Sequence, residues 1–203
     1  GIAGLAAWLP LEWRARLQEG ETVLVLGASG AVGQVAIQAA RILGAGTVVA
    51  AARSGDGLER ARVLGADATV RIEDAVQPEE LAEAIVEAAD GPIDVTVDPL
   101  WGEPAVAAAH AAAECGRIVQ VGQSAGARAE LPSAPVRGKL LAVLGHTNLK
   151  APREVVADAY RRMTGHAAEG RLEVEHEVLP LDRVAEAWER QTAFPHRKLV
   201  LAP

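Results

Sequence analysis

The residues best suited to chemistry form a glycine-rich turn between a predicted strand and a predicted helix. The strand is the apolar run Thr22–Leu26, and apolar side chains recur at helical spacing from Val32 onward. Binding of a diphosphate requires backbone N–H donors, a close backbone approach and an open helix N-terminus, all of which such a turn supplies. The candidate dinucleotide contacts of this turn are Gly27, Ser29, Gly30, Ala31, Val32 and Gly33.

The spacing of these glycines departs from the dinucleotide-binding pattern G-x-G-x-x-G. Ala28 occupies the first glycine position, and Gly27 lies one residue earlier. Within the pattern, Gly30 would allow the backbone to approach the diphosphate, and Gly33 would let the helix pack closely on the strand. A tight strand-to-helix turn that binds no ligand is the alternative interpretation.

A second set of candidate residues follows the apolar run Thr47–Ala52. In nucleotide-binding folds of this type, an Asp or Glu near this point accepts hydrogen bonds from the adenosine ribose of NAD. Here Ala52 is followed by Arg53 and Ser54, with no carboxylate. Since a guanidinium binds a 2′-phosphate through charge-assisted hydrogen bonds, these residues favour NADP(H). The alternative interpretation of Arg53 is a solvent-exposed loop arginine.

The elements that would position these residues are six predicted strands, mostly separated by segments with helical periodicity. The strands are predicted at Thr22–Leu26, Thr47–Ala52, Ala68–Ile72, Ile93–Val97, Arg117–Val121 and Leu140–Leu144. Strands that alternate with helices in this way predict an α/β fold with a doubly wound parallel sheet. Ligands of such sheets bind at the carboxyl ends of the strands, where both sets of candidate residues lie. This unit is assigned to residues 1–150.

Residues 151–203 follow a different pattern and are assigned to a separate segment. From Leu172 to Val178, apolar residues alternate with three glutamates. The alternation predicts a half-exposed strand, with His176 packed on its apolar face. A further helix and a further strand are predicted at Asp182–Arg190 and Lys198–Leu201. These strands are not expected to extend the parallel sheet.

Composition narrows the classes of partner. Half of the 203 residues are hydrophobic, and the net charge is −7 with no basic stripe, which argues against nucleic acid. Cys115 is the single cysteine, so an internal disulfide and a cysteine-rich zinc site are excluded, and a buried thiol is expected. No apolar segment reaches the length of a membrane span, so we expect no membrane partner and a cytoplasmic protein.

The chain resembles the medium-chain dehydrogenase/reductase superfamily, in particular its zinc-independent quinone-oxidoreductase branch. Any one of the matching pieces is a weak signal, but they occur in the order that the family shows. The pieces are GIAGLAAWLPL, ETVLVLGASGAVG, ERARVLGADATV, IDVTVDP, GRIVQVG, PLDRVAEAWER and RKLVL.

The resemblance implies a Rossmann-type dinucleotide-binding domain at 1–150 followed, at 151–203, by a C-terminal segment of a barrel-like, GroES-like catalytic domain. The N-terminal part of that catalytic domain would be absent from this chain. The resemblance also implies that Gly122 and Gln123 contact the nicotinamide. Relatives often carry a phosphate-binding lysine near the place of Gly57, so Arg53 or Arg60 would have to replace it.

A metal site is not expected. In zinc-dependent relatives a cysteine ligand often stands where this chain has Ile2, and an isoleucine cannot bind zinc. The histidines show no metal-ligand spacing; they are His110, His146, His166, His176 and His196.

The activity implied by the resemblance is NADPH-dependent transfer of hydride to a small-molecule substrate, either a quinone or an α,β-unsaturated carbonyl, with no catalytic residue assigned. One alternative is an NADP(H)-binding module or fragment without catalysis of its own, and a weaker one is an alcohol dehydrogenase-type activity. A homodimer through the edge strand Leu140–Leu144 is also expected from the resemblance.

Overall fold

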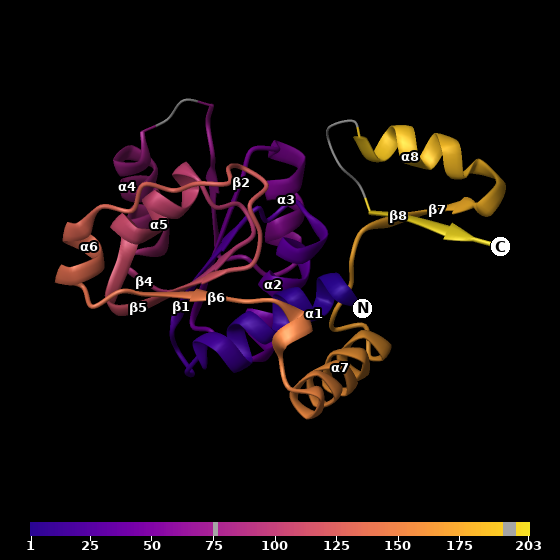
Figure 1. Ribbon diagram of the computed structural model, residues 1–203, viewed down its shortest axis with the longest axis horizontal. Helices are drawn as coiled ribbons and strands as arrows, with labels where there is room; N and C mark the ends of the chain where they lie inside the picture. The colour runs from indigo at the N-terminus through magenta and orange to yellow at the C-terminus, as the bar shows by residue number, and fades with distance from the viewer. Residues whose placement is uncertain (75–76, 193–197) are drawn as a thin grey trace.

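A computed structural model describes residues 1–74, 77–192 and 198–203 (Figure 1). Its centre is a six-stranded parallel sheet with the strand order β3-β2-β1-β4-β5-β6. The strands are β1 (Thr22–Leu26), β2 (Thr47–Ala52), β3 (Ala68–Arg71), β4 (Ile93–Asp98), β5 (Ala112–Gln120) and β6 (Ala142–Gly145). This order is that of a Rossmann fold, so the predicted doubly wound sheet is confirmed.

Helices cover both faces of the sheet, as a doubly wound topology requires. On one face lie α1 (Ile2–Leu9), α2 (Ala31–Ile42), α3 (Gly55–Val63) and α7 (Arg153–Ala168). On the other face lie α4 (Pro78–Ala89), α5 (Glu103–Ala111) and the short α6 (Ser133–Gly138). Between α1 and β1 the chain forms a π-helical segment, η1 (Pro10–Ala15).

The two faces explain why the first strand is an unbroken apolar run. Val23 and Val25 of β1 pack beneath α2, whereas Leu24 and Leu26 pack on the side of α4 and α5. Because successive side chains of a strand point to opposite faces, a strand covered on both sides has no exposed positions to give to polar residues.

The strands that follow α7 do not extend the main sheet, as expected, and form a small unit of their own, whereas α7 itself packs on the core of the main sheet. A 3-10 turn, η2 (Asn148–Lys150), precedes α7, and a second sheet pairs β7 (His176–Pro180) in parallel with β8 (Lys198–Ala202). Between these two strands lie a 3-10 turn, η3 (Leu181–Arg183), and α8 (Val184–Thr192). Figure 1 shows this unit standing apart from the main sheet and joined to it by the chain that follows α7.

The strand predicted from Leu172 to Val178 is wrong in its position. The strand begins only at His176, and Leu172 is buried in the main core instead. The backbone groups of residues 173 and 175 bond to glutamine side chains of α2, so this segment is an extended linker and not a strand of the second sheet. His176, expected to be packed, is exposed because it lies at the start of β7, beyond the core.

Cys115 is exposed, which corrects the expected buried thiol. The residue has a positive φ of 59° and lies where the pairing of β4 with β5 shifts register. Its N–H donates to the Lys139 carbonyl oxygen at 2.6 Å, so local backbone contacts hold it outside the core.

The last strand of the sheet is shorter than the predicted Leu140–Leu144. The segment between β5 and β6 contains α6, which is not predicted from the sequence, and the Leu141 N–H donates to the Val136 carbonyl at the end of that helix. Leu140 has a φ of 52° and cannot continue a strand, so β6 begins at Ala142.

Candidate functional site

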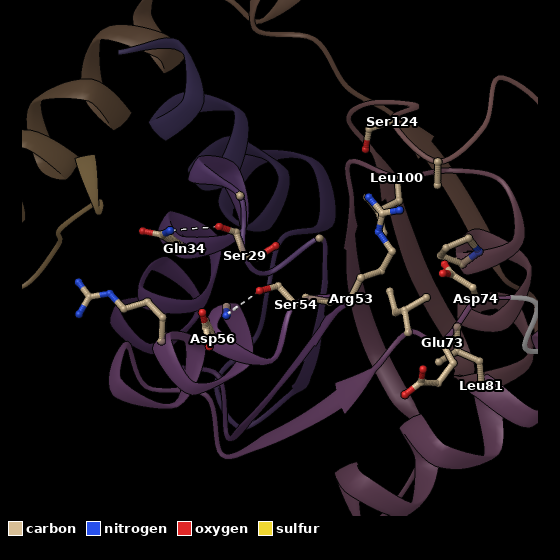
Figure 2. Close-up of a pocket in the computed structure, with 18 of the residues that line it drawn as sticks. Ser29, Gln34, Arg53, Ser54, Asp56, Glu73, Asp74, Leu81, Leu100 and Ser124 are labelled. Carbon is tan, nitrogen blue, oxygen red and sulfur yellow. Dashed lines mark hydrogen bonds between the residues drawn. The ribbon is translucent and has the colours of Figure 1, made fainter. Parts of the chain in front are cut away.

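A pocket of about 1120 Å³ opens at the carboxyl ends of the strands. It lies beside the point where the strand order reverses between β1 and β4, the place where doubly wound sheets bind their ligands. Figure 2 shows 18 of the lining residues; the lining comes from the turn after β1, from α2, α3 and α4, and from the segments after β2, β3, β4 and β5.

The glycine-rich turn forms one wall of this pocket. Gly27, Ser29 and Gly30 line it directly. Gly30 is the N-cap of α2, and no side chain caps this helix end. The hydrogen bonds of α2 begin at Gln34, whose N–H donates to the Gly30 carbonyl oxygen at 2.9 Å. The preceding N–H groups of the first turn are therefore available to an anion.

Three predicted contacts, Ala31, Val32 and Gly33, form the first turn of α2, and their side chains are not part of the described lining. Gly33 has a packing role that the sequence pattern anticipates. A Cβ at this position would lie 2.4 Å from the Gly27 carbonyl oxygen and 2.5 Å from Ala28 Cα. The helix therefore rests directly on the backbone of the turn, as the third glycine of the dinucleotide-binding pattern allows.

Arg53 and Ser54 lie at the carboxyl end of β2, and both line the pocket. Figure 2 shows the Arg53 side chain extending into the pocket, toward the wall that carries Leu100 and Ser124. The Ser54 hydroxyl accepts a hydrogen bond from Gly57 N–H at 3.2 Å and so caps the N-terminus of α3.

The place of the family's lysine, Gly57, cannot hold a long side chain in this fold. A Cβ there would lie 2.4 Å from the Cβ of Ser29, because the first turn of α3 packs against the glycine-rich turn. Arg60 also lines the pocket, but its guanidinium pairs with Glu173 at 2.5 Å. Both candidate arginines line the pocket, and Figure 2 shows the labelled Arg53 side chain extending into it.

The opposite wall depends on Asp98, at the end of β4. Its side chain is fully buried, and Oδ1 accepts hydrogen bonds from the N–H groups of Leu100 and Trp101, both at 2.8 Å. Burial raises the pKa of Asp98, and these two hydrogen bonds oppose the rise. The carboxyl group thus fixes the turn that brings Leu100 to the pocket.

Gly122 and Gln123 follow β5 at the same edge of the sheet, but the described lining continues with Ser124 and Ala125. Gly122 packs against the loop after β4, since a Cβ there would lie 2.7 Å from the Pro99 carbonyl oxygen. The structure therefore places these two residues next to the pocket, and their contact with a nicotinamide stays a prediction.

Carboxylates form a large part of the lining and were not predicted from the sequence. The acidic lining residues are Asp56, Glu59, Glu73, Asp74, Glu103 and Glu175. Glu73 and Asp74 could have been found, because they follow β3, the neighbour of β2 in the sheet, at its carboxyl end. Glu175 carries no such signal, because it arrives on the linker from a distant part of the chain.

Within the described ranges, no group of three or more His, Cys, Asp or Glu side chains is placed to hold a metal ion. Ile2 begins α1, and His196 lies outside the described residues. His146, after β6, contacts the Asn148 side chain through Nε2 at 2.9 Å, and burial lowers its pKa. In the part of the chain that the structure describes, no helix is both long and apolar enough to span a membrane.

Comparison with known proteins agrees with this architecture. The sequence profile of a family described as zinc-binding dehydrogenase matches residues 31–165. Quinone oxidoreductase-like protein 2 of Bos taurus is 33% identical over 135 residues, which are 66% of this chain and 38% of the bovine protein.

Two solved structures extend the similarity over nearly the whole chain. A candidate alcohol dehydrogenase from Sinorhizobium meliloti 1021 is 32% identical with a TM-score of 0.83, and the match covers 100% of this chain and 53% of that one. The CurK enoyl reductase is 25% identical with a TM-score of 0.78, and the match covers 98% of this chain and 60% of that one. The chain thus spans less than two thirds of the length of each of these proteins.

Proposed function

Since this chain belongs to the zinc-binding dehydrogenase family of the medium-chain dehydrogenase/reductase superfamily, we propose that it is the cofactor-binding part of an NADPH-dependent oxidoreductase. The observation that carries the proposal is the pocket, which is lined by the glycine-rich turn on one side and by Arg53 at the end of β2 on the other. The uncapped N-terminus of α2 fits a diphosphate, and the adjoining pocket leaves space for an adenosine.

The preference for NADP(H) over NAD(H) rests on the end of β2. Ala52 is buried and brings no carboxylate to accept a ribose hydroxyl. Arg53 offers a planar guanidinium that suits a 2′-phosphate. The six acidic side chains that line this pocket would repel a dianionic phosphate. The positive charge of Arg53 would offset this repulsion, so it would contribute more to phosphate binding here than in a neutral site.

We propose a quinone or an α,β-unsaturated carbonyl compound as the substrate class. The names of the bovine relative and of the CurK enoyl reductase support these two classes. Bound NADPH would supply the hydride, and the residues of this chain would bind the cofactor, orient it and exclude water from one side. No side chain of this chain is assigned as a proton donor.

The division into residues 1–150 and 151–203 is part of the proposal. The second unit, with β7, α8 and β8, would belong to a GroES-like catalytic domain that meets the pocket. Its apolar side chains support an interface role, because Trp188 is 75% exposed on α8.

Calorimetric titration of the wild type and of Arg53→Ala with NADPH and with NADH tests the cofactor assignment. We expect the substitution to reduce NADPH affinity by about 1.5–3 kcal/mol, the worth of a hydrogen bond to a charged group. NADH affinity should stay unchanged. Arg62→Ala is the matched control, because Arg62 is an exposed arginine of α3 that pairs with Glu59. Equal losses for both cofactors would contradict a role of Arg53 in binding the 2′-phosphate.

A second candidate function is an NADP(H)-binding module without turnover, because the described lining of the pocket accounts for cofactor binding and no proton donor is assigned in it. Oxidation of NADPH in the presence of 9,10-phenanthrenequinone separates the two. An enzyme would consume NADPH in proportion to the quinone added, whereas a module would bind NADPH without oxidising it.

A further inference from the structure

The linker between α7 and β7 is held by two glutamines of α2. Gln38 Nε2 donates to the Glu173 carbonyl oxygen at 2.8 Å, and Glu173 N–H donates to Gln38 Oε1 at 2.8 Å. One turn earlier on the helix, Gln34 Oε1 accepts from Glu175 N–H at 2.9 Å. The two side chains therefore satisfy the linker backbone as a neighbouring strand would.

Gln34 makes one further contact that Gln38 does not make. Its Nε2 donates to the Ser29 carbonyl oxygen at 3.1 Å. Ser29 belongs to the glycine-rich turn and lines the pocket. A single amide group thus joins the backbone of the turn to the backbone of the linker, through its donor at one end and its acceptor at the other.

Both glutamine side chains are buried, so the loss of these hydrogen bonds would be costly. Gln34 is only 6% exposed and Gln38 only 7%, so water cannot replace a lost partner without cost. The linker is also tied to α3 through the pair of Arg60 with Glu173. Glu175, the residue that Gln34 holds, lines the pocket itself.

We propose that Gln34 and Gln38 are positioning residues that dock the linker beside the dinucleotide site, and that Gln34 couples occupancy of the turn to the position of the linker. The proposal rests on the proposed binding of NADPH. Ordering of the turn by a diphosphate would hold the Ser29 carbonyl in place, and the Gln34 amide would then hold Glu175 more firmly. By thermodynamic reciprocity, a docked linker must raise cofactor affinity by the same factor.

Amide hydrogen exchange, resolved residue by residue by NMR with and without saturating NADPH, tests the coupling. In the wild type, NADPH should slow exchange at the Glu175 amide by about fivefold, the lower end of typical coupling factors. In Gln34→Met, this amide should exchange faster without cofactor and should no longer respond to NADPH. NADPH affinity should fall by about the same factor.

Two further variants separate coupling from simple docking. Gln38→Met should speed exchange at Glu173 while leaving the response of Glu175 to NADPH in place, because Gln38 does not touch the turn. Gln18→Met is the matched control, since Gln18 is exposed and lies away from the linker. If Gln34→Met does not fold, Gln34→Asn serves, because the shorter amide cannot reach both partners.

The outcomes distinguish the two proposals. If NADPH binds but exchange at Glu175 does not change, or if Gln34→Met still shows the change, the coupling is overturned and the cofactor assignment stands. If NADPH does not bind to the wild type at all, the cofactor assignment and the coupling are both overturned.

Discussion

Two glycines of the same turn serve different purposes. At Gly33 an added Cβ would collide with backbone atoms of the turn, whereas at Gly30 the nearest heavy atom would lie 3.5 Å away, at the Gly27 carbonyl oxygen. The first position is therefore constrained by the packing of the protein on itself. The second has room for a methyl group in the fold, and its glycine is explained by the close approach of a ligand.

Alanine at each position separates these purposes. We expect Gly33→Ala to lower the free energy of unfolding by about 1–3 kcal/mol, because backbone atoms must move to make room. Gly30→Ala should leave stability near that of the wild type and weaken NADPH binding. Urea unfolding and calorimetric titration of both variants measure this, and equal destabilisation of the two would contradict the distinction.

His146 is a second residue whose surroundings predict a measurable effect. It lies edge-on to Trp13 with ring centroids 6.0 Å apart, and burial is the main cause of its lowered pKa. A base with a lowered pKa in the folded state binds fewer protons than in the unfolded chain. Its contribution to stability is then complete above about pH 6.5, the ordinary pKa of histidine, and declines as the pH falls below that value.

His146→Phe keeps an aromatic ring against Trp13 and removes the titration. We expect the free energy of unfolding of the wild type to fall more steeply than that of His146→Phe when the pH is lowered from 7 toward 5. Urea unfolding across this range measures the difference. Parallel curves for the two proteins would show that His146 does not contribute to the acid sensitivity.

At the level of single elements, helices α4 and α5 pack against each other and on the sheet through small side chains of α5. The alanines of α5 that belong to the core beneath α4 are Ala107, Ala108, Ala109 and Ala111. Small residues let the helices and the sheet approach closely, but they leave no space for a larger group.

Ala108→Leu should therefore destabilise the protein by about 1–3 kcal/mol through overpacking. Ala84→Leu is the control, because Ala84 is exposed on the neighbouring α4 and leucine is also a good helix former. Thermal unfolding of both variants provides the comparison. A similar loss in the two would mean that helix propensity, and not core packing, decides the effect.

At the level of the whole molecule, β6 is one of the two edge strands of the main sheet, and β3 is the other. An unpaired edge offers a row of backbone donors and acceptors to another chain. The homodimer expected from the family resemblance would use this edge, now bounded at Ala142–Gly145, and it stays a prediction.

Val143→Lys tests the edge contact, because Val143 lies on β6 with 38% of its surface exposed and a lysine disfavours strand pairing. We expect the wild type to sediment as a dimer and this variant as a monomer. Leu149→Lys, on η2 and outside the strand, should remain dimeric. A monomeric wild type at micromolar concentration would refute the dimer.

Much of the fold could be predicted because local pattern and tertiary environment agree. Thr22–Leu26 and Thr47–Ala52 are strands at the predicted bounds, since every residue after the first threonine of each strand is apolar and buried within the sheet. The predicted strand Leu172–Val178 was wrong in its position because local pattern and tertiary environment conflict there. The alternation of side chains is that of a strand, but the backbone N–H groups of Glu173 and Glu175 bond to glutamine side chains of α2.

The amino-acid sequence alone predicts the parallel sheet, the glycine-rich turn and the absence of a carboxylate after β2. Each of these is encoded by neighbouring residues, through the period of apolar side chains and the special geometry of glycine. Three other features are visible in the tertiary structure alone: Arg53 extends into the pocket, acidic side chains line the pocket, and Gln34 joins the turn to Glu175. Those contacts unite segments far apart in the chain, so no local pattern can specify them.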